Sequence, residues 1–455
     1  MSARRNSGGS LPRTGIPGAP AAILVISAAL GGFLFSFNST LGTLALAVAG
    51  TGGLAALLVW PELALALYVV IGDVKGDERI ASLVPYDLTL VLGAVLIAGI
   101  ALNLLRGKQP LPMPPAYFLF VVLIAMMTAS LSYTPVFAAG LEKLGRFLCV
   151  TSIAIFAPFF ALGTLGATKR FLAGLAAIAF TICAWSLHAL GGAGRLATPS
   201  DNTIGLGHIA CALILLIWFA VDSRLSLPWR FVSYAFLAVP ALALIGSGSR
   251  GPAVACAAVI FISLLFCRRR WLDVALLAVI GAAAFPFAKV PASSRDYLGT
   301  LIVSKSLSAL MSFRGDLLAS GWTILRLHPL LGIGIQGFRY GSPNPALYNW
   351  PHNIFLEVAC ELGIPAGLIV CAIFGSAIRE SFRQLRNRVA PDAMLAEVAA
   401  ALLLVGIING TNTGDINSDR STWLFLSLVF VVRGLRLRSE RSHQDTQEAP
   451  RSLAA

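Results

Sequence analysis

The sequence contains little charge for its length. Asp, Glu, Lys and Arg make up 12% of its 455 residues, whereas 57% are hydrophobic. Soluble domains carry about 25% charged residues, so this composition excludes an ordinary soluble domain and indicates a polytopic membrane protein. The net charge of +13 does not point to nucleic acid as a partner, because the basic residues stand in short clusters between apolar runs.

Several chemical signatures are also missing from the sequence. No His, Cys, Asp and Glu residues show metal-ligand spacing, and there is no phosphate-binding loop, dinucleotide-binding glycine fingerprint or Gly-x-Ser-x-Gly elbow. The seven cysteines lie in or beside apolar segments, so we predict packing roles for them and no disulfide framework. We expect neither a metal nor a cofactor.

Apolar segments recur along most of the chain and predict an all-α transmembrane bundle. A helix needs about 20 residues to cross the hydrocarbon core. The predicted segments are 21–37, 42–59, 61–72, 86–105, 115–132, 141–163, 170–190, 205–221, 228–246, 251–267, 271–288, 353–377, 393–410 and 420–434. The segment 61–72 is too short alone, and we expect a half-span or a fusion with its neighbour across Pro61. The predicted total is 12 to 14 spans.

Basic clusters predict which way the bundle faces. They fall in alternate connections, which the positive-inside rule places in the cytoplasm together with both chain ends. These clusters are Arg106/Lys108, Lys169/Arg170, Arg224/Arg230, Arg268 to Arg270, Arg379 to Arg388 and Arg433 to Arg441. The resulting organisation is a disordered cytoplasmic tail (1–20), a first bundle part (21–288), a long outer loop (289–352), a last bundle part (353–434) and a second cytoplasmic tail (435–455).

The long outer loop is predicted to contain a short amphipathic helix. The segment Leu317 to Leu327 includes Trp322, and His328-Pro329 ends it. Such a helix is expected to lie across the membrane surface. Arg314 is expected to lie at the start of this helix. It could bind a ligand or be a solvated surface arginine.

His352 and Asn353 follow the outer loop and precede an apolar helix. Pro351 suits the first turn of a helix, and the positive end of a helix dipole disfavours imidazolium. A neutral histidine at this place can accept a proton, although it could instead cap the helix end. Asn353, Glu357 and Glu361 are spaced by four residues and share a face toward the bundle interior, where the glutamates could pair with an arginine.

Arg250 lies in a glycine-rich turn, Gly246 to Pro252, on the same predicted side. Glycines let the backbone approach a ligand, and a guanidinium presents a planar fork that suits phosphate oxygens. This arrangement predicts anion binding at a helix start. The alternative is an arginine that extends to lipid headgroups.

Other polar residues on the outer side have both a binding and a structural interpretation. Arg146 shares a helix face with Lys143, but Glu142 is four residues before Arg146 and could pair with it. In another outer connection, the chain carries Arg195, Asp201, Asn202 and His208. Asp201-Asn202 could be only the cap of the following helix.

Taken together, these motifs resemble the O-antigen ligase and Wzy-type polysaccharide polymerase superfamily of bacterial inner-membrane glycosyltransferases. The resemblance covers about 135–370. Its motifs are Ser249-Arg250-Gly251; Asp201-Asn202 with Gly205; Arg314 and Trp322 followed by 328–334; and His352-Asn353 with Leu356-Glu357 and 361–367. One departure is Asp201, which stands where the family often has proline.

The resemblance implies metal-independent transfer of a glycan from undecaprenyl diphosphate to an acceptor sugar hydroxyl at the periplasmic face. His352 would be the general base on that hydroxyl or would orient it, and Arg250 would bind the donor diphosphate. The remaining substrate-binding residues would be Arg314, Arg146, Arg195, Asn353, Asn202 and Arg339.

Alternative functions remain open from the sequence. The acceptor would be lipid A-core in an O-antigen ligase or a growing glycan in an O-antigen or exopolysaccharide polymerase, and protein glycosylation is a third option. A transporter or flippase of lipid-linked saccharides would show repeated halves and charges at mid-membrane depth. A non-catalytic scaffold would not need His352. The gathering of polar motifs at one surface favours the enzyme, with the ligase ahead of the polymerase.

Overall fold

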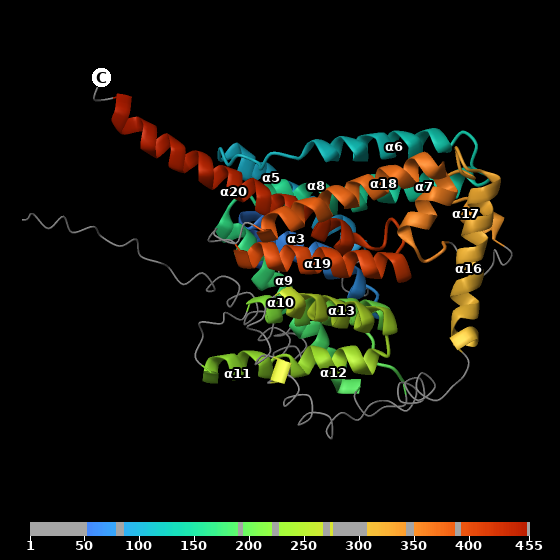
Figure 1. Ribbon diagram of the computed structural model, residues 1–455, viewed down its shortest axis with the longest axis horizontal. Helices are drawn as coiled ribbons and strands as arrows, with labels where there is room; N and C mark the ends of the chain where they lie inside the picture. Colours follow the sequence, from blue (N-terminus) through green and yellow to red (C-terminus); the bar gives the residue numbers. More distant parts are fainter. Residues whose placement is uncertain are drawn as a thin grey trace, which may run out of the picture.

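The computed structural model describes residues 52–78, 86–189, 194–220, 227–266, 274–275, 307–342, 350–386 and 393–452. Within these ranges the regular structure is entirely helical, which confirms the all-α prediction. The helices run largely side by side in one elongated bundle (Figure 1). This arrangement is that of a multi-pass membrane protein.

The helix boundaries follow the apolar segments of the sequence closely. The helices are α3 (Pro61–Val70), α5 (Leu88–Leu105), α6 (Phe118–Ser130), α7 (Phe137–Arg146), α8 (Ser152–Ala161), α9 (Leu165–Ser186), α10 (Thr203–Ala220), α11 (Leu227–Ala235), α12 (Ala238–Ser247), α13 (Arg250–Phe266), α16 (Leu307–Leu327), α17 (Phe338–Gly341), α18 (Ile354–Arg386), α19 (Ala393–Asn412) and α20 (Arg420–Ser452). Short 3₁₀ or π turns are η1 (Ile71–Asp73), η2 (Pro115–Tyr117), η3 (Phe147–Thr151) and η4 (Leu187–Ala189).

Seven of the described helices are long and apolar enough to cross a membrane. An eighth span is counted if Gly52–Val59 and Pro61–Asp73, which bend by 109° at the break between them, form one broken span. Both predicted alternatives for 61–72, a half-span and a fusion with its neighbour across Pro61, fit this bend. The predicted total of 12 to 14 spans includes the segments 21–37 and 271–288, which lie outside the described residues except for 274–275, and it stays a prediction.

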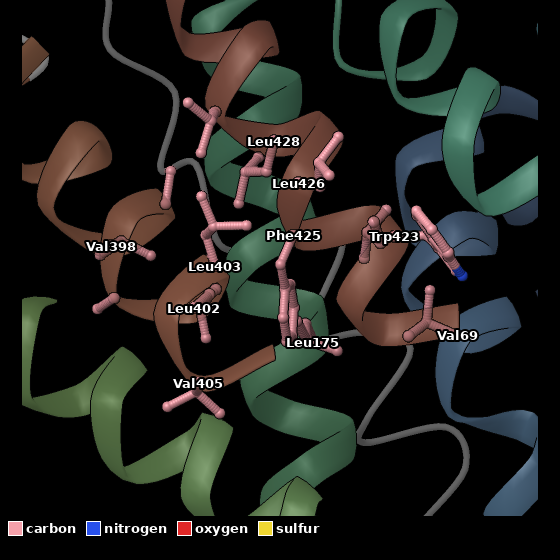
Figure 2. Packing of buried hydrophobic residues seen from close by; sticks show 14 of the residues in the cluster. Val69, Leu175, Val398, Leu402, Leu403, Val405, Trp423, Phe425, Leu426 and Leu428 are labelled. Atoms are coloured by element: carbon pink, nitrogen blue, oxygen red, sulfur yellow. The ribbon is translucent and has the colours of Figure 1, made fainter. Parts of the chain in front are cut away.

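The core lies where α19 and α20 pack against each other and α20 packs against α8 and α3. Figure 2 shows Leu402 and Leu403 of α19 beside Phe425 of α20, with Leu175 of α9 nearby. All of these side chains are buried. Because lipid tails are as apolar as leucine, close packing rather than exclusion of water holds such helices together.

Helix α16 lies across the ends of the other helices rather than along them (Figure 1). It ends at Leu327, as predicted from His328-Pro329, because proline disfavours helical backbone in the residue before it. It begins at Leu307, ten residues before the predicted start. Arg314 therefore lies inside α16 and does not open it, because the apolar residues before it continue the helix.

Helix α18 is broken at Gly363, whose backbone has φ +87° and ψ 169°. The outer segment 329–334 fills the break: Ile364 N–H donates to Pro329 O (2.8 Å), Ile333 N–H to Cys360 O (3.0 Å) and Gly334 N–H to Glu361 O (2.8 Å). Backbone groups that the break would leave unsatisfied in the membrane thus find partners. The contact fixes the outer loop against the first turns of α18.

The last helix, α20, continues to Ser452. It therefore runs through most of the segment 435–455 that the sequence assigns to a cytoplasmic tail. At the other end of the chain, the predicted tail 1–20 lies outside the described residues.

Candidate functional site

His352 lies just before α18 in a left-handed backbone conformation, with φ +55°. The helix begins at Ile354, so Pro351 precedes it and does not form its first turn. Asn353 caps it: its Oδ1 accepts from Leu356 N–H (3.0 Å), and its Nδ2 donates to Thr411 O (3.1 Å). Because its short polar side chain satisfies an orphan N–H, Asn353 sets the start of the helix.

Two groups compete for Nδ1 of the half-buried His352. The indole N–H of Trp350 lies 3.2 Å from Nδ1, and the backbone oxygen of Thr413 lies 3.5 Å from it. A neutral imidazole carries one proton, so Nδ1 either accepts from Trp350 or donates to Thr413. Only in the second case is Nε2 available to accept a proton.

Thr413 connects three parts of the chain around His352. Its hydroxyl donates to Asn409 O (3.1 Å) and lies 3.2 Å from Nε2 of His208 on α10. The helix start that carries Arg250 is adjacent, because a Cβ on Gly251 would lie 3.9 Å from Cγ2 of Thr413. The structure therefore brings the Arg250 turn and His352 to the same neighbourhood.

The turn before Arg250 is held by hydrogen bonds from neighbouring segments. Gly248 adopts φ +61° and ends α12, and Arg250 begins α13. Arg195 Nε donates to Ser247 O (2.6 Å) and its Nη2 to Ser249 Oγ (3.3 Å), while Ser249 Oγ donates to Thr203 O (2.9 Å). Arg195 therefore braces the turn that presents the half-buried Arg250.

Asn202 has a structural role in the same region. Its Oδ1 accepts from Gly205 N–H (2.9 Å) at the start of α10, and its Nδ2 donates to Asp73 Oδ1 (3.1 Å). Asp201 before it has φ +56°. The capping interpretation of Asp201-Asn202 accounts for the contact with Gly205, and the contact with Asp73 ties the start of α10 to η1.

A buried cluster of ion pairs joins α7 to the first turns of α18, the helix that follows His352. Lys143 Nζ lies 2.5 Å from Glu357 Oε1 and 2.7 Å from Glu361 Oε2, and all three side chains are almost fully buried. The partner of the glutamates is thus a lysine of α7, not the expected arginine. Glu357 also accepts from Ile416 N–H (3.0 Å) and Glu361 from Gln336 N–H (3.0 Å). The cluster joins α7, α18 and both adjacent connections.

The other predicted arginines take separate positions. Arg146 pairs with Glu142 at 2.5 Å, and both side chains are about two-thirds exposed, as the pairing alternative predicts. Arg339 is exposed on the short helix α17. The side chain of Arg314 lies outside the described residues.

The connection 413–419 is a part of the site that sequence reasoning did not single out. Asp415 Oδ1 accepts from Asn417 N–H (2.7 Å) and Ser418 N–H (3.0 Å), and Asn417 Nδ2 donates to Lys143 O (3.0 Å). Burial raises the pKa of Asp419 to about 6 despite hydrogen bonds from Thr422 and Ser421 that lower it. A polar run between two apolar helices was the signal available in the sequence.

An apolar groove of about 660 Å³ runs between α16 and α18. Its lining consists of Leu318, Ala319, Trp322, Leu325, Asn353, Phe355, Leu356, Ala359, Ile364, Gly367, Leu368 and Cys371. Asn353 is the neighbour of His352 in the chain, so one end of the groove adjoins the histidine. The groove can accept an extended hydrocarbon chain.

One comparison with known proteins identifies the middle of the chain. Residues 235–371 match the family model described as O-antigen ligase. This part of the chain resembles an O-antigen ligase domain. The match confirms the resemblance to the O-antigen ligase and Wzy superfamily, and this family implies a glycosyltransferase-type enzyme that acts on lipid-linked glycans. No curated protein matches the chain significantly.

The matched O-antigen ligase domain contains Arg250, the described part of the outer loop, His352 and the groove. It does not contain Arg195, Lys143 or Thr413, which hold the domain's residues in place from outside. The candidate site is therefore formed by the domain together with α7, the segment before α10 and the connection 413–419.

Proposed function

We propose that the protein transfers a glycan from undecaprenyl diphosphate to a sugar hydroxyl of lipid A-core at the periplasmic face of the bacterial inner membrane. The observation that carries this proposal is the convergence of His352 and the Arg250 turn on Thr413. A candidate proton acceptor and the turn that carries a candidate anion-binding arginine thus both lie next to Thr413, in the part of the chain that matches the O-antigen ligase family.

The chemistry needs little beyond these two groups. The acceptor oxygen attacks the anomeric carbon of the donor, the bond from that carbon to the diphosphate oxygen breaks, and the hydroxyl proton passes to Nε2 of His352. The lipid diphosphate leaves with its electron pair. Arg250 stabilises the negative charge that develops on it, and because a guanidinium stays protonated, it does not compete for the proton.

The tautomer of His352 decides whether it can act as the base. When Nδ1–H donates to Thr413 O, Nε2 is the nitrogen without hydrogen and can accept the proton. When Nδ1 instead accepts from Trp350, Nε2 carries hydrogen and could only orient the acceptor. We propose the first arrangement during transfer, with Thr413 O stabilising the imidazolium that forms.

The groove between α16 and α18 supports a polyprenyl-linked donor. It is lined almost entirely by apolar side chains, and Asn353 at its end adjoins His352. A polyprenyl tail lying in it would leave the diphosphate at the end of the groove that adjoins His352. We propose that this surface is periplasmic, because the basic clusters of the alternate connections favour a cytoplasmic position for the opposite surface.

The test uses lipopolysaccharide from a strain that lacks the chromosomal gene and expresses variants. His352→Ala is expected to reduce transfer by about 10²- to 10⁴-fold, because a positioned base contributes that much. Arg250→Ala should reduce transfer by a similar factor. Arg250→Lys should transfer more than Arg250→Ala but less than the parent protein, since an ammonium lacks the planar fork. His188→Ala, an exposed histidine in η4, is the matched control.

The gel pattern separates the candidate acceptors. Loss of a ligase leaves bare core while lipid-linked chains accumulate, whereas loss of a polymerase leaves core that bears one repeat unit. Normal lipopolysaccharide from His352→Ala at unchanged protein level would contradict the proton-acceptor role. Full activity of Arg250→Lys would contradict the bidentate contact with phosphate.

A further inference from the structure

The far end of α18 carries a basic groove that has no part in the proposed transfer. It has a volume of about 700 Å³. The described residues that line it are Gly375, Ile378, Arg379, Phe382, Arg383 and Arg386. These positions recur every three or four residues, so they form one continuous face of the helix.

This groove lies at the membrane surface opposite the His352 site. Arg379 follows His352 by 27 residues in the sequence, and about 20 helical residues suffice to cross the hydrocarbon core. The stretch of α18 after Gly363 is apolar up to Ile378, where the arginines begin. The three arginines therefore lie at the depth of lipid headgroups.

The opposite face of the same helical segment is occupied by packing. The buried side chain of Gln384 donates to Val429 O of α20 (2.9 Å), and the buried Glu380 lies 3.5 Å from Arg433 Nη1. Arg383 makes only a distant pair with Glu380, at 3.9 Å, and its side chain is 67% exposed. Glu380 and Gln384 thus face the protein interior, and Arg379, Arg383 and Arg386 lie on the opposite face of the helix, here called the arginine face.

The arginine face also presents apolar side chains. Phe382 is 60% exposed and Ile378 is 38% exposed, and both line the groove together with the arginines. A soluble anion would need the arginines but not these side chains. A phospholipid would use both, because its phosphate accepts hydrogen bonds from guanidinium groups while its acyl chains lie along the apolar residues.

We propose that this groove binds an anionic phospholipid, with its headgroup phosphate held by Arg379, Arg383 and Arg386 and its acyl chains against Ile378 and Phe382. The charge of the groove complements the anionic lipids of the cytoplasmic leaflet. Only the choice of leaflet depends on the orientation under the proposed function. The binding itself is independent of glycan transfer.

The test measures lipid binding to the purified full-length protein in a neutral detergent by native mass spectrometry. Phosphatidylglycerol is the probe, phosphatidylcholine is the zwitterionic comparison, and soluble glycerol phosphate separates headgroup chemistry from lipid binding. The variant R379Q/R383Q/R386Q is expected to lose about fivefold in affinity for phosphatidylglycerol per arginine removed. Phe382→Ala should weaken binding of the lipid but not of glycerol phosphate.

The matched control removes the same charge elsewhere on the predicted cytoplasmic side. Arg106, Lys169 and Arg441 are exposed, and R106Q/K169Q/R441Q is expected to keep the affinity of the parent protein. If both triple variants lost the same affinity for phosphatidylglycerol, the effect would come from general charge, and the proposed site would be wrong. Equal binding of phosphatidylcholine and phosphatidylglycerol would also contradict the site. Arg383→Gln alone, with thermal unfolding in lipid-free detergent as a folding check, covers the case in which the triple variant misfolds.

Lipopolysaccharide gels of the His352→Ala strain test the proposed function independently of lipid binding. If the groove binds no lipid while His352→Ala still abolishes transfer, the inference fails and the function stands. If the groove binds lipid while His352→Ala transfers glycan normally, the reverse holds. Tight association of a cytoplasmic protein or of RNA with the arginine face, in place of phospholipid, would also overturn the proposal.

Discussion

At the scale of single residues, the main question is which hydrogen bond His352 makes. Its Nδ1 is within reach of the Trp350 indole and of the Thr413 backbone oxygen. These two contacts require different tautomers, and only the second leaves Nε2 able to take a proton. The left-handed backbone of His352 keeps the ring between both partners.

The substitution Trp350→Phe separates the two roles of His352. It removes the indole N–H and keeps an aromatic ring, so Nδ1–H can donate to Thr413 without competition. If His352 is a base, we expect the transfer rate in membrane vesicles to stay within a few-fold of the parent protein. A loss as large as that of His352→Ala would show that the histidine works as a hydrogen-bond donor.

At the scale of secondary-structure elements, the break in α18 fixes the outer loop to the bundle. Gly363 provides a backbone conformation that only glycine adopts readily, and a Cβ there would overlap the backbone carbonyl of Leu330. Glu361, two residues earlier, accepts from the loop backbone and pairs with Lys143. Loop, α7 and α18 are therefore positioned by the same few residues.

We expect Gly363→Ala to destabilise the protein by about 1–3 kcal/mol, because a non-glycine residue in this conformation is strained and the overlap displaces the loop. Thermal unfolding in detergent measures the cost, and hydrogen exchange of residues 329–336 reports whether the loop detaches. Gly145→Ala in α7, where a Cβ meets nothing within 4 Å, is the control and should be neutral or slightly stabilising. Unchanged exchange in Gly363→Ala would contradict the anchoring role.

At the scale of the whole molecule, the two grooves lie at opposite ends of α18. The apolar groove adjoins His352 and is closed on one side by α16, which crosses the end of the bundle (Figure 1). The basic groove lies beyond the spanning part of the same helix. If the apolar groove holds the donor tail, a bulky side chain that fills the groove must reduce transfer without changing the fold.

Ala319→Trp tests this consequence. Ala319 lines the groove and is exposed, so an indole can fill the groove without entering the packed core. We expect at least a tenfold loss of transfer, with an unchanged unfolding temperature. The control is Thr323→Trp, an exposed position one turn along α16 that is not in the lining. Equal activity of the two variants would exclude the groove as the donor's path.

The membrane class, most helix boundaries and the end of α16 before Pro329 could be predicted from the amino-acid sequence. These features depend on local hydropathy and on backbone preferences, which are properties of neighbouring residues. The family resemblance was also readable, because its motifs are short. The predicted starts of two helices were wrong: α16 begins at Leu307 and α18 begins at Ile354. Where a helix begins depends on whether the residues before it continue the helical backbone or cap it.

The long-range partners of the polar residues depend on the tertiary structure. Lys143 and Glu361 are 218 residues apart, and no local pattern indicates that they pair, or that Arg195 holds the turn before Arg250. The position of Thr413 depends on the packing of three other segments, which carry His352, His208 and Gly251. The physical reason is that burial makes an unpaired polar group costly, so each finds a partner, but which partner depends on the three-dimensional packing of the helices.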